Sequence, residues 1–338
     1  MKIHGDPAPV LDLIEAFRRS KAMFTAVRFG IFDRLENEPQ NAGDMAAKLN
    51  LNVDALTRLL DACVSLRLLA REGRIYRNTP AASRYLVSSG EETLAGYIAY
   101  SDESLYQLWS HLDDAVREGA NRWTQTFGSR DALFSHFFRD DASTRSFLAG
   151  MHGFGKIASR LVVRAFDLSR FHHLVDLGGA TGHLAIAACQ AYPELRATVL
   201  DLPQVEAFAR ERIAQSSVAD RIEFTCGDFF ASELPSSDLY ALGRILHDWG
   251  EPEITGLLRN IFDRLPSGGG LLIAEALVND DRTGPVYALM QDLNMLVCTD
   301  GRERTPSEYR ALLEAAGFKT VEFHRTGSLV DATLASKQ

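Results

Sequence analysis

The chain has 338 residues, with 36 lysines and arginines against 45 aspartates and glutamates, and a formal net charge of −9. At about 100–200 residues per domain, this length indicates two domains. The hydrophobic fraction of 46% and the charged fraction of 24% are those of a globular protein, which excludes a disordered or collagen-like chain. The acidic balance argues against a protein that binds nucleic acid through a broad basic surface.

Neither the cysteines nor the N-terminus indicates an extracellular or membrane protein. The four cysteines are far apart and form no CxxC pair, so we expect reduced thiols in a reducing compartment. The N-terminal segment MKIHGDPAPVLDLIEAF contains acids and prolines where a signal peptide would be apolar. No run approaches the roughly 18 apolar residues of a membrane helix. We therefore expect a soluble, cytoplasmic protein with no membrane partner.

The first 80 residues are predicted to form helices followed by a β-hairpin. Apolar residues with a period near 3.6 predict helices over 10–35, 42–50 and 53–70. The segment REGRIYRNTP predicts a hairpin that turns at Gly73. Two helices and a hairpin, in this order, are typical of a winged helix.

From residue 171 the pattern changes from mostly helical to alternating strands and helices. The strand-like runs are HHLVDLGGATG, ATVLDLP, RIEFTCGDFF, DLYALGRILHDW and GGGLLIAEALV, and helical stretches at 183–192, 204–215 and 253–265 separate them. This alternation predicts an α/β, Rossmann-like, doubly wound parallel sheet. We expect a helical, winged-helix domain over 1–168 and the sheet domain over 169–338.

A glycine-rich turn, GGATG, joins the first of these strands to a helix. Glycines allow a sharp turn and a close approach to a ligand, which binds outside the carboxyl ends of the strands in such sheets. Ala180 stands where the dinucleotide pattern G-x-G-x-x-G requires its second glycine, which disfavours an NAD-dependent oxidoreductase. The neighbouring Asp176 suits a ligand with an ammonium or sulfonium group better than a pyrophosphate.

Acidic residues also follow the next two strands. Asp201 lies about 20 residues after the glycine turn, where a carboxylate accepts hydrogen bonds from ribose hydroxyls. Asp228 and Phe229 end the third strand and are suited to an adenine, with its amino group on the carboxylate and its face on the ring. Three successive strand ends of this kind predict a site for a nucleoside-type ligand.

The runs VDLGGATGHLA, VLDLP, GDFF, LGRILHDW and GRERT together resemble the S-adenosyl-L-methionine (SAM) dependent O-methyltransferases of the caffeate and acetylserotonin type. Bacterial antibiotic-pathway methyltransferases of secondary metabolism share the pattern. The resemblance covers nearly the whole chain. It implies a class I methyltransferase fold, a winged helix that serves homodimerisation, and SAM as cofactor with S-adenosyl-L-homocysteine as product. It also implies no metal and no nucleic-acid partner.

The resemblance further implies a set of cofactor-binding residues: Gly178, Gly179, Asp201, Leu202, Asp228, Phe229 and Arg244. Relatives usually carry lysine at position 244, and arginine and lysine are not geometrically interchangeable. They also usually carry glycine at position 180, where this chain has alanine.

His247, in the run LHDW, matches the general base of the family. A neutral imidazole, with a pKa of about 6.5, can take the proton of a phenol, with a pKa of about 10, as the oxygen attacks the methyl group. Glu303 in GRERT matches the acid that orients this histidine. Glu275 matches a second flanking acid or caps the sheet edge, and Asp248 contacts either His247 or the acceptor.

The acceptor pocket is predicted to lie between the two domains. A pocket lined by aromatic rings and methionines suits a flat, apolar acceptor. The candidate substrate-binding residues are Met151, Phe154, Met290, Asn294 and Cys298.

The leading prediction is a SAM-dependent O-methyltransferase that acts on a hydroxyl of a small aromatic or polyketide-type metabolite. The runner-up is a SAM-binding relative with hydroxylase-like or decarboxylase-like chemistry, which the presence of His247 and Glu303 disfavours. Methylation of nitrogen or of a carboxylate would need the base less. A winged-helix DNA-binding regulator is a third alternative, but aspartates interrupt the arginines of its recognition helix.

Overall fold

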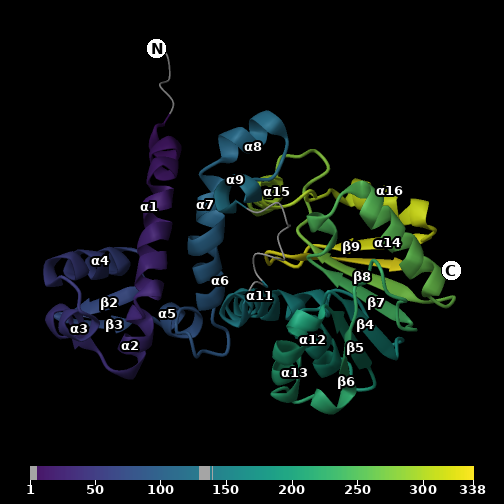
Figure 1. Ribbon diagram of the computed structural model, residues 1–338, viewed down its shortest axis with the longest axis horizontal. Helices are drawn as coiled ribbons and strands as arrows, with labels where there is room; N and C mark the ends of the chain where they lie inside the picture. Colours follow the sequence, from purple (N-terminus) through teal and green to yellow (C-terminus); the bar gives the residue numbers. More distant parts are fainter. Residues whose placement is uncertain (1–5, 129–137, 139) are drawn as a thin grey trace. The chain divides into compact units, whose positions relative to one another are not determined.

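The computed structural model describes residues 6–128, 138 and 140–338 (Figure 1). The chain divides into two compact units, Met1–Ser104 and Leu105–Gln338. The predicted division at residue 168 instead marks the point, within the second unit, where strands begin to alternate with helices. Within the described ranges, no helix is both long enough and apolar enough to cross a membrane.

The first unit begins with helices α1 (Ala8–Arg28) and α2 (Ile31–Asn37), where the sequence predicts a single helix over 10–35. That prediction is wrong because Gly30 has a φ of 65°, a left-handed conformation that interrupts an α-helix. Helices α3 (Ala42–Leu49) and α4 (Val53–Ser65) follow. Helix α4 ends earlier than predicted, because the residues beyond it pair as a strand.

The predicted hairpin is present as β2 (Leu69–Glu72) and β3 (Ile75–Asn78), which pair antiparallel. A two-residue strand β1 (Gln40–Asn41) adds to the other side of β3. Helices α5 (Pro80–Tyr85) and α6 (Ala95–Tyr100) and a π-helical turn complete this unit.

The second unit opens with helices, as the sequence predicts, and continues as a seven-stranded sheet. The helices described before the sheet are α7 (Tyr106–Trp109), α8 (Leu112–Glu118), α9 (Trp123–Phe127) and α11 (Asp141–Val162). The strands are β4 (His173–Leu177), β5 (Arg196–Asp201), β6 (Ile222–Cys226), β7 (Leu239–Gly243), β8 (Gly270–Glu275), β9 (Thr320–His324) and β10 (Asp331–Ser336).

The order of the strands is β6-β5-β4-β7-β8-β10-β9. The first five are parallel and correspond to the five predicted runs. Strand β10 is antiparallel to both β8 and β9, and the sequence prediction missed this pair. The chain order changes direction between β4 and β7, which places the ligand-binding crevice of such a sheet outside their carboxyl ends.

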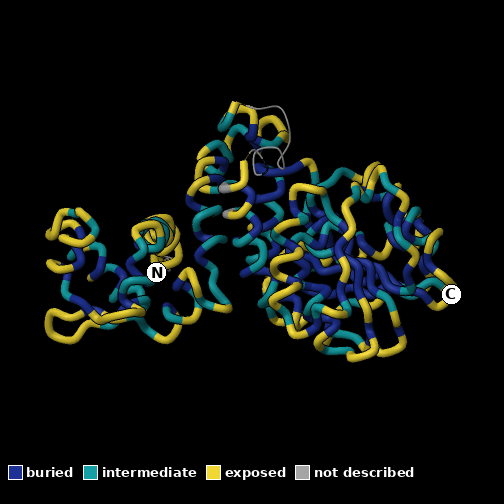
Figure 2. Tube along the Cα trace, turned by 60° about the horizontal axis from the view of Figure 1, so that its bottom comes forward, coloured by how far each residue is buried: buried dark blue, intermediate teal, exposed yellow. Residues whose placement is uncertain are grey.

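Helices cover both faces of this sheet, and the strands form a buried layer (Figure 2). Side chains alternate along each strand, so Val175 and Leu177 of β4 pack on one face against α14 (Glu251–Arg264) and α16 (Pro306–Ala316). Asp176 points to the opposite face, beneath α12 (His183–Ala191). The remaining helices of this unit are α13 (Glu206–Ala214) and α15 (Val286–Cys298).

Candidate active site

The predicted cofactor residues gather where the parallel strands end. A Cβ on Gly178 would lie 2.6 Å from Cδ1 of Ile245 and 3.2 Å from Cε1 of Phe229. The turns that follow β4, β6 and β7 are therefore in contact, although they are far apart in sequence. Gly178 also has a φ of 66°, which a side chain would strain. Only glycine fits this turn without displacing its neighbours.

Ala180 adopts a left-handed conformation, with a φ of 48°. For an alanine this conformation costs about 1–2 kcal/mol. The N–H of Ala180 donates to Oδ2 of Asp201 and the N–H of Leu202 donates to Oδ1, both at 2.7 Å. Burial raises the pKa of Asp201, and these two donors act in the opposite direction. The carboxylate thus fastens the glycine turn to the end of β5.

Asp228 and Phe229 follow β6 at the same edge. The Asp228 side chain lies in an exposed segment, and its Oδ1 accepts the N–H of Phe230 at 2.9 Å. The Phe229 ring is half-buried and lies 4.7 Å from the Phe230 ring. A carboxylate and an aromatic face therefore lie together next to the glycine turn, the combination predicted for an adenine.

Asp176 does not lie at the ligand edge as the sequence suggests. Its side chain is 1% exposed, and it accepts the N–H of Ala185 at 3.3 Å in the first turn of α12. Burial raises its pKa to about 7, although the Ala185 donor opposes this shift. A Cβ on Gly179 would lie 2.6 Å from its carboxylate, so Asp176 supports the glycine turn from within.

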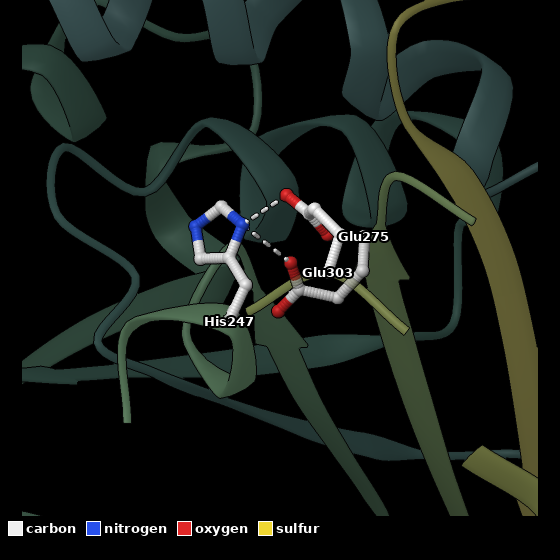
Figure 3. A group of neighbouring side chains, drawn as sticks. All are labelled: His247, Glu275 and Glu303. Atoms are coloured by element: carbon white, nitrogen blue, oxygen red, sulfur yellow. Dashed lines mark hydrogen bonds and ion pairs between the residues drawn. The ribbon is translucent and has the colours of Figure 1, made fainter. Parts of the chain in front are cut away.

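His247 lies in a short 3₁₀ turn, Leu246–Asp248, after β7, and its two ring nitrogens have different surroundings (Figure 3). Nδ1 lies 2.6 Å from Oε1 of Glu303 and 3.2 Å from Oε2 of Glu275. Nε2 is directed away from this pair and lies 3.6 Å from Oδ1 of Asp248. The structure therefore brings together all four residues that the sequence predicts to be catalytic.

Burial of His247 by itself lowers the pKa of the imidazole. The negative charges of Glu275, Glu303 and Asp248 outweigh this effect and raise the pKa to about 9. Burial also raises the pKa values of Glu275 and Asp248. The carboxylates thus favour a positively charged ring, the state that results when Nε2 accepts a proton.

Glu275, the last residue of β8, combines the two roles considered for it. Its Oε1 accepts the backbone N–H groups of Ile245 and Leu246, both at 2.9 Å, while Oε2 faces His247. One carboxylate thus holds the backbone before His247 and also contacts its ring. The ligand atoms of His247, Glu275 and Glu303 lie within 4.8 Å of one another, a spacing that could also hold a metal ion. The 2.6 Å contact between His247 and Glu303 is, however, already a hydrogen bond.

Gly301 is a further determinant of the site that the sequence prediction missed. A Cβ at this position would lie 2.2 Å from the carbonyl oxygen of His247 and 2.6 Å from the backbone nitrogen of Trp249. The segment that carries Glu303 can approach the His247 turn this closely only because residue 301 has no side chain.

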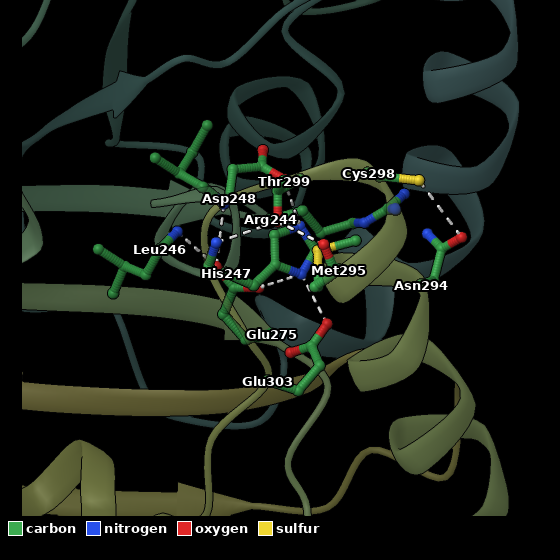
Figure 4. Close-up of polar contacts among 12 residues, drawn as sticks. Arg244, Leu246, His247, Asp248, Glu275, Asn294, Met295, Cys298, Thr299 and Glu303 are labelled. Atoms are coloured by element: carbon green, nitrogen blue, oxygen red, sulfur yellow. Dashed lines mark hydrogen bonds and ion pairs between the residues drawn. The ribbon is translucent and has the colours of Figure 1, made fainter. Parts of the chain in front are cut away.

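The predicted substrate-binding residues divide into two groups, one on α11 and one on α15. Figure 4 shows Asn294 and Cys298 of the second group together with Arg244. The Arg244 guanidinium lies 4.6 Å from the centroid of the Phe154 ring, and its Nη1 lies 3.9 Å from Sδ of Met151. Asn294 and Cys298 are one turn apart, with 3.6 Å between Oδ1 and Sγ. Arg244, predicted to bind the cofactor, thus directs its side chain toward predicted acceptor residues.

Met290 and Trp109 depart from the predicted arrangement. Met290 is 46% exposed, whereas Asn294 is 8% exposed. Trp109 was not predicted as a site residue, yet its Nε1–H donates to Oδ1 of Asn294 at 2.8 Å. No local pattern could reveal this contact, because the two residues come from helices far apart in the chain.

Comparison with known proteins identifies the family. A family model described as an O-methyltransferase domain matches residues 109–319, and an O-methyltransferase dimerisation domain matches residues 11–88. The chain is 42% identical to acetylserotonin O-methyltransferase of Gallus gallus, over 98% of this chain and 97% of the relative. It is 38% identical to the Homo sapiens enzyme of that name, over 96% of both chains. The chain belongs to the SAM-dependent O-methyltransferases.

Solved structures agree with this assignment. Human N-acetylserotonin methyltransferase in complex with SAM superposes on this O-methyltransferase with a TM-score of 0.93, covering 100% of this chain and 99% of the other. PigF with SAH gives a TM-score of 0.88 at 28% identity, covering 98% and 100%. The class I methyltransferase fold, the N-terminal dimerisation domain and the use of SAM are thereby confirmed.

Gly301→Ala is predicted to impair catalysis by this O-methyltransferase while leaving SAM binding intact. The new methyl group would displace the His247 turn, and a misplacement of about 1 Å can cost about 100-fold in rate. Turnover and SAM affinity by calorimetry would check this. Gly256→Ala is the control, because a Cβ there meets nothing within 4 Å. Equal turnover of the two variants would contradict the prediction.

Proposed function

We propose that this O-methyltransferase methylates a hydroxyl group of a small aromatic acceptor, with His247 as the general base. The observation that carries the proposal is the placement of Glu275 and Glu303 on the same ring nitrogen of His247. Glu303 accepts the hydrogen bond of Nδ1, and the charge of Glu275 lies 3.2 Å from the same nitrogen. The hydrogen of the neutral ring is thus held on Nδ1, which leaves Nε2 with a lone pair to accept a proton. Bound SAM would supply an electrophilic methyl group on its sulfonium.

In the proposed reaction, Nε2 of His247 takes the proton of the acceptor hydroxyl as the oxygen attacks. The ring becomes an imidazolium, whose charge is stabilised by Glu303 and Glu275 at Nδ1 and by Asp248 near Nε2. General base catalysis of this kind contributes about 100–10,000-fold. Alignment of the reacting atoms in a closed site can contribute a further 7–11 kcal/mol or so.

The cofactor residues follow from the edge of the sheet. We propose that Gly178 and Gly179 border the methionine part of SAM and that Asp201, with Leu202 packed nearby, binds the ribose. Asp228 and Phe229 would bind the adenine. The contact of the Gly178 turn with Phe229 supports a single continuous site for these groups.

For the acceptor, we propose a phenolic hydroxyl on a small aromatic compound that also carries an amide or a similar polar group. Relatives at 38–42% identity are named acetylserotonin O-methyltransferases, which makes N-acetylserotonin the first compound to test. The Trp109 indole donates to Oδ1 of Asn294, so the amide NH₂ is the group that this residue can offer to an acceptor. Phe154 and Met151, which lie against the Arg244 side chain, would provide apolar surface.

We also propose that the enzyme is a homodimer. Its dimerisation domain presents an apolar stripe on α1 in which each residue is more than half exposed. A stripe of this kind is typical of a surface that a partner covers. Its members are Val10, Leu11, Leu13, Ile14 and Phe17.

Replacement of His247 tests the general base directly. His247→Ala should reduce turnover of N-acetylserotonin by about 100–10,000-fold, because no ring nitrogen is left to take the proton of the substrate hydroxyl. SAM affinity, measured by calorimetry, should change little. His172→Ala serves as the control, since that side chain is 82% exposed. Unchanged turnover in His247→Ala would refute the assignment.

The pH dependence of turnover should reflect the pKa of His247, which the surrounding carboxylates raise. We expect kcat for a phenol to rise as the pH increases towards about 9, because His247 must first lose the proton that its carboxylates hold. Glu303→Gln removes one of these negative charges and lowers the pKa of His247. The rising limb should therefore move to lower pH by about 1–2 units. The exposed control Glu233→Gln should keep the wild-type pH profile. A rising limb of Glu303→Gln at the same pH as in wild type would argue against this prediction.

The dimer can be tested by light scattering. Phe17→Glu places a charge in the apolar α1 stripe, so the mass at micromolar concentration should fall from that of two chains to that of one. Val286→Glu, at a position 75% exposed outside the dimerisation domain, should leave the mass unchanged. A monomeric wild-type protein would contradict the homodimer.

A further inference from the structure

We propose that Arg304 is a positioning residue for the reaction: its buried guanidinium joins the turn that carries His247 to the segment that carries Glu303. The inference rests on the proposed role of His247 as the general base. It concerns a residue whose hydrogen bonds go to the peptides that precede His247 and Glu303.

The contacts of one nitrogen carry the proposal. Nη1 of Arg304 donates to the carbonyl oxygen of Leu246 at 3.0 Å and to that of Arg302 at 3.1 Å. Leu246 immediately precedes His247, and Arg302 immediately precedes Glu303. One guanidinium therefore links the backbone directly before His247 to the backbone directly before Glu303, and these two residues share the Nδ1–Oε1 hydrogen bond.

The backbone of Arg304 is itself firmly placed. It pairs with Leu277 in a parallel bridge just beyond β8, and its carbonyl oxygen accepts the N–H of Val278 at 3.1 Å. Thr305, the next residue, forms a capping box with Glu308 at the start of α16. The guanidinium is thus held between a sheet edge and a helix end, which makes it a rigid reference for the His247 turn.

Arg304, Glu275 and Glu303 all act on one buried group, the hydroxyl of Tyr309. Burial, Glu275 and Glu303 all raise the pKa of the Tyr309 hydroxyl, whereas Arg304 acts to lower it. The four side chains therefore share one buried region.

One donor of the Arg304 side chain, Nε, makes no hydrogen bond within the part of the chain that the structure describes, so stability alone does not explain this side chain. The side chain is 1% exposed, and its Nε is buried with no hydrogen-bond partner among the residues that the structure describes. An unsatisfied buried donor costs stability, so each such group requires an explanation. We attribute it to the need to reach both carbonyl oxygens from the sheet edge.

The test compares Arg304→Met with Arg302→Met. Arg302 is the neighbouring arginine, and its guanidinium pairs with Glu308 and Glu251, outside the His247 cluster. Arg304→Met should lower kcat for N-acetylserotonin by about 10–100-fold, as expected for a misplaced catalytic group, with SAM affinity unchanged. Arg302→Met should stay within about threefold of wild type. Equal losses in the two variants would overturn the proposal.

A double variant separates positioning from general damage to the fold. If Arg304 acts through His247, His247→Ala combined with Arg304→Met should be no slower than His247→Ala alone, because the group being positioned is gone. A further loss of 10-fold or more in the double variant would overturn the proposal. Should Arg304→Met fail to fold, Arg304→Lys keeps the charge and one donor, and it should retain intermediate turnover.

A measurement that needs no acceptor keeps this inference distinct from the proposed function. The proton shared by Nδ1 of His247 and Glu303 should give a low-field NMR resonance in ¹⁵N-histidine-labelled protein, which His247→Ala assigns by removing it. Arg304→Met or Arg304→Lys should shift or broaden this resonance, and Arg302→Met should not. If His247→Ala retains full turnover, the general base fails; an unmoved resonance in both Arg304 variants overturns the positioning role alone.

Discussion

The hydrogen bond between Nδ1 of His247 and Oε1 of Glu303 is the interaction on which the rest of this site depends. It forms between groups that are buried, so it needs both partners to be placed within a few tenths of an ångström and both peptides to be supported. Its consequence is chemical. It fixes the hydrogen of the neutral ring on Nδ1, and in the proposed mechanism this leaves Nε2 for the acceptor.

The run GRERT shows how a short segment can supply most of that support. Gly301 allows the segment to touch the backbone of the His247 turn. Arg302 pairs with Glu251 and Glu308 outside the His247 cluster, and we do not expect it to affect the position of the ring. Glu303 contacts the ring, and Arg304 reaches the carbonyl oxygen before His247. Thr305 begins the next helix. Neighbouring residues thus act on one turn of chain from several directions.

The cluster also shows why charge must be considered locally rather than over the whole chain. Three carboxylates surround one buried imidazole, and their combined effect outweighs the desolvation that would otherwise keep the ring neutral. A ring that favours the protonated state is a stronger base once it has lost its proton. It is also less often free at neutral pH. The balance between these effects is set by the burial and spacing of a few side chains, and the net charge of −9 says nothing about it.

The sequence by itself determined the helix–helix–hairpin order, the five parallel strands and the residue types at their ends, because periodicity and turn chemistry are local properties. Through the resemblance of its motifs it also supplied the residues that we propose to be catalytic. It did not determine the break at Gly30, the antiparallel pair β9 and β10, or the buried position of Asp176. Only the tertiary structure decided the contacts that orient the site, such as Trp109 with Asn294 and Arg304 with Leu246. Such contacts join segments distant in the chain, and their distances depend on how the sheet and helices pack, which no local pattern records.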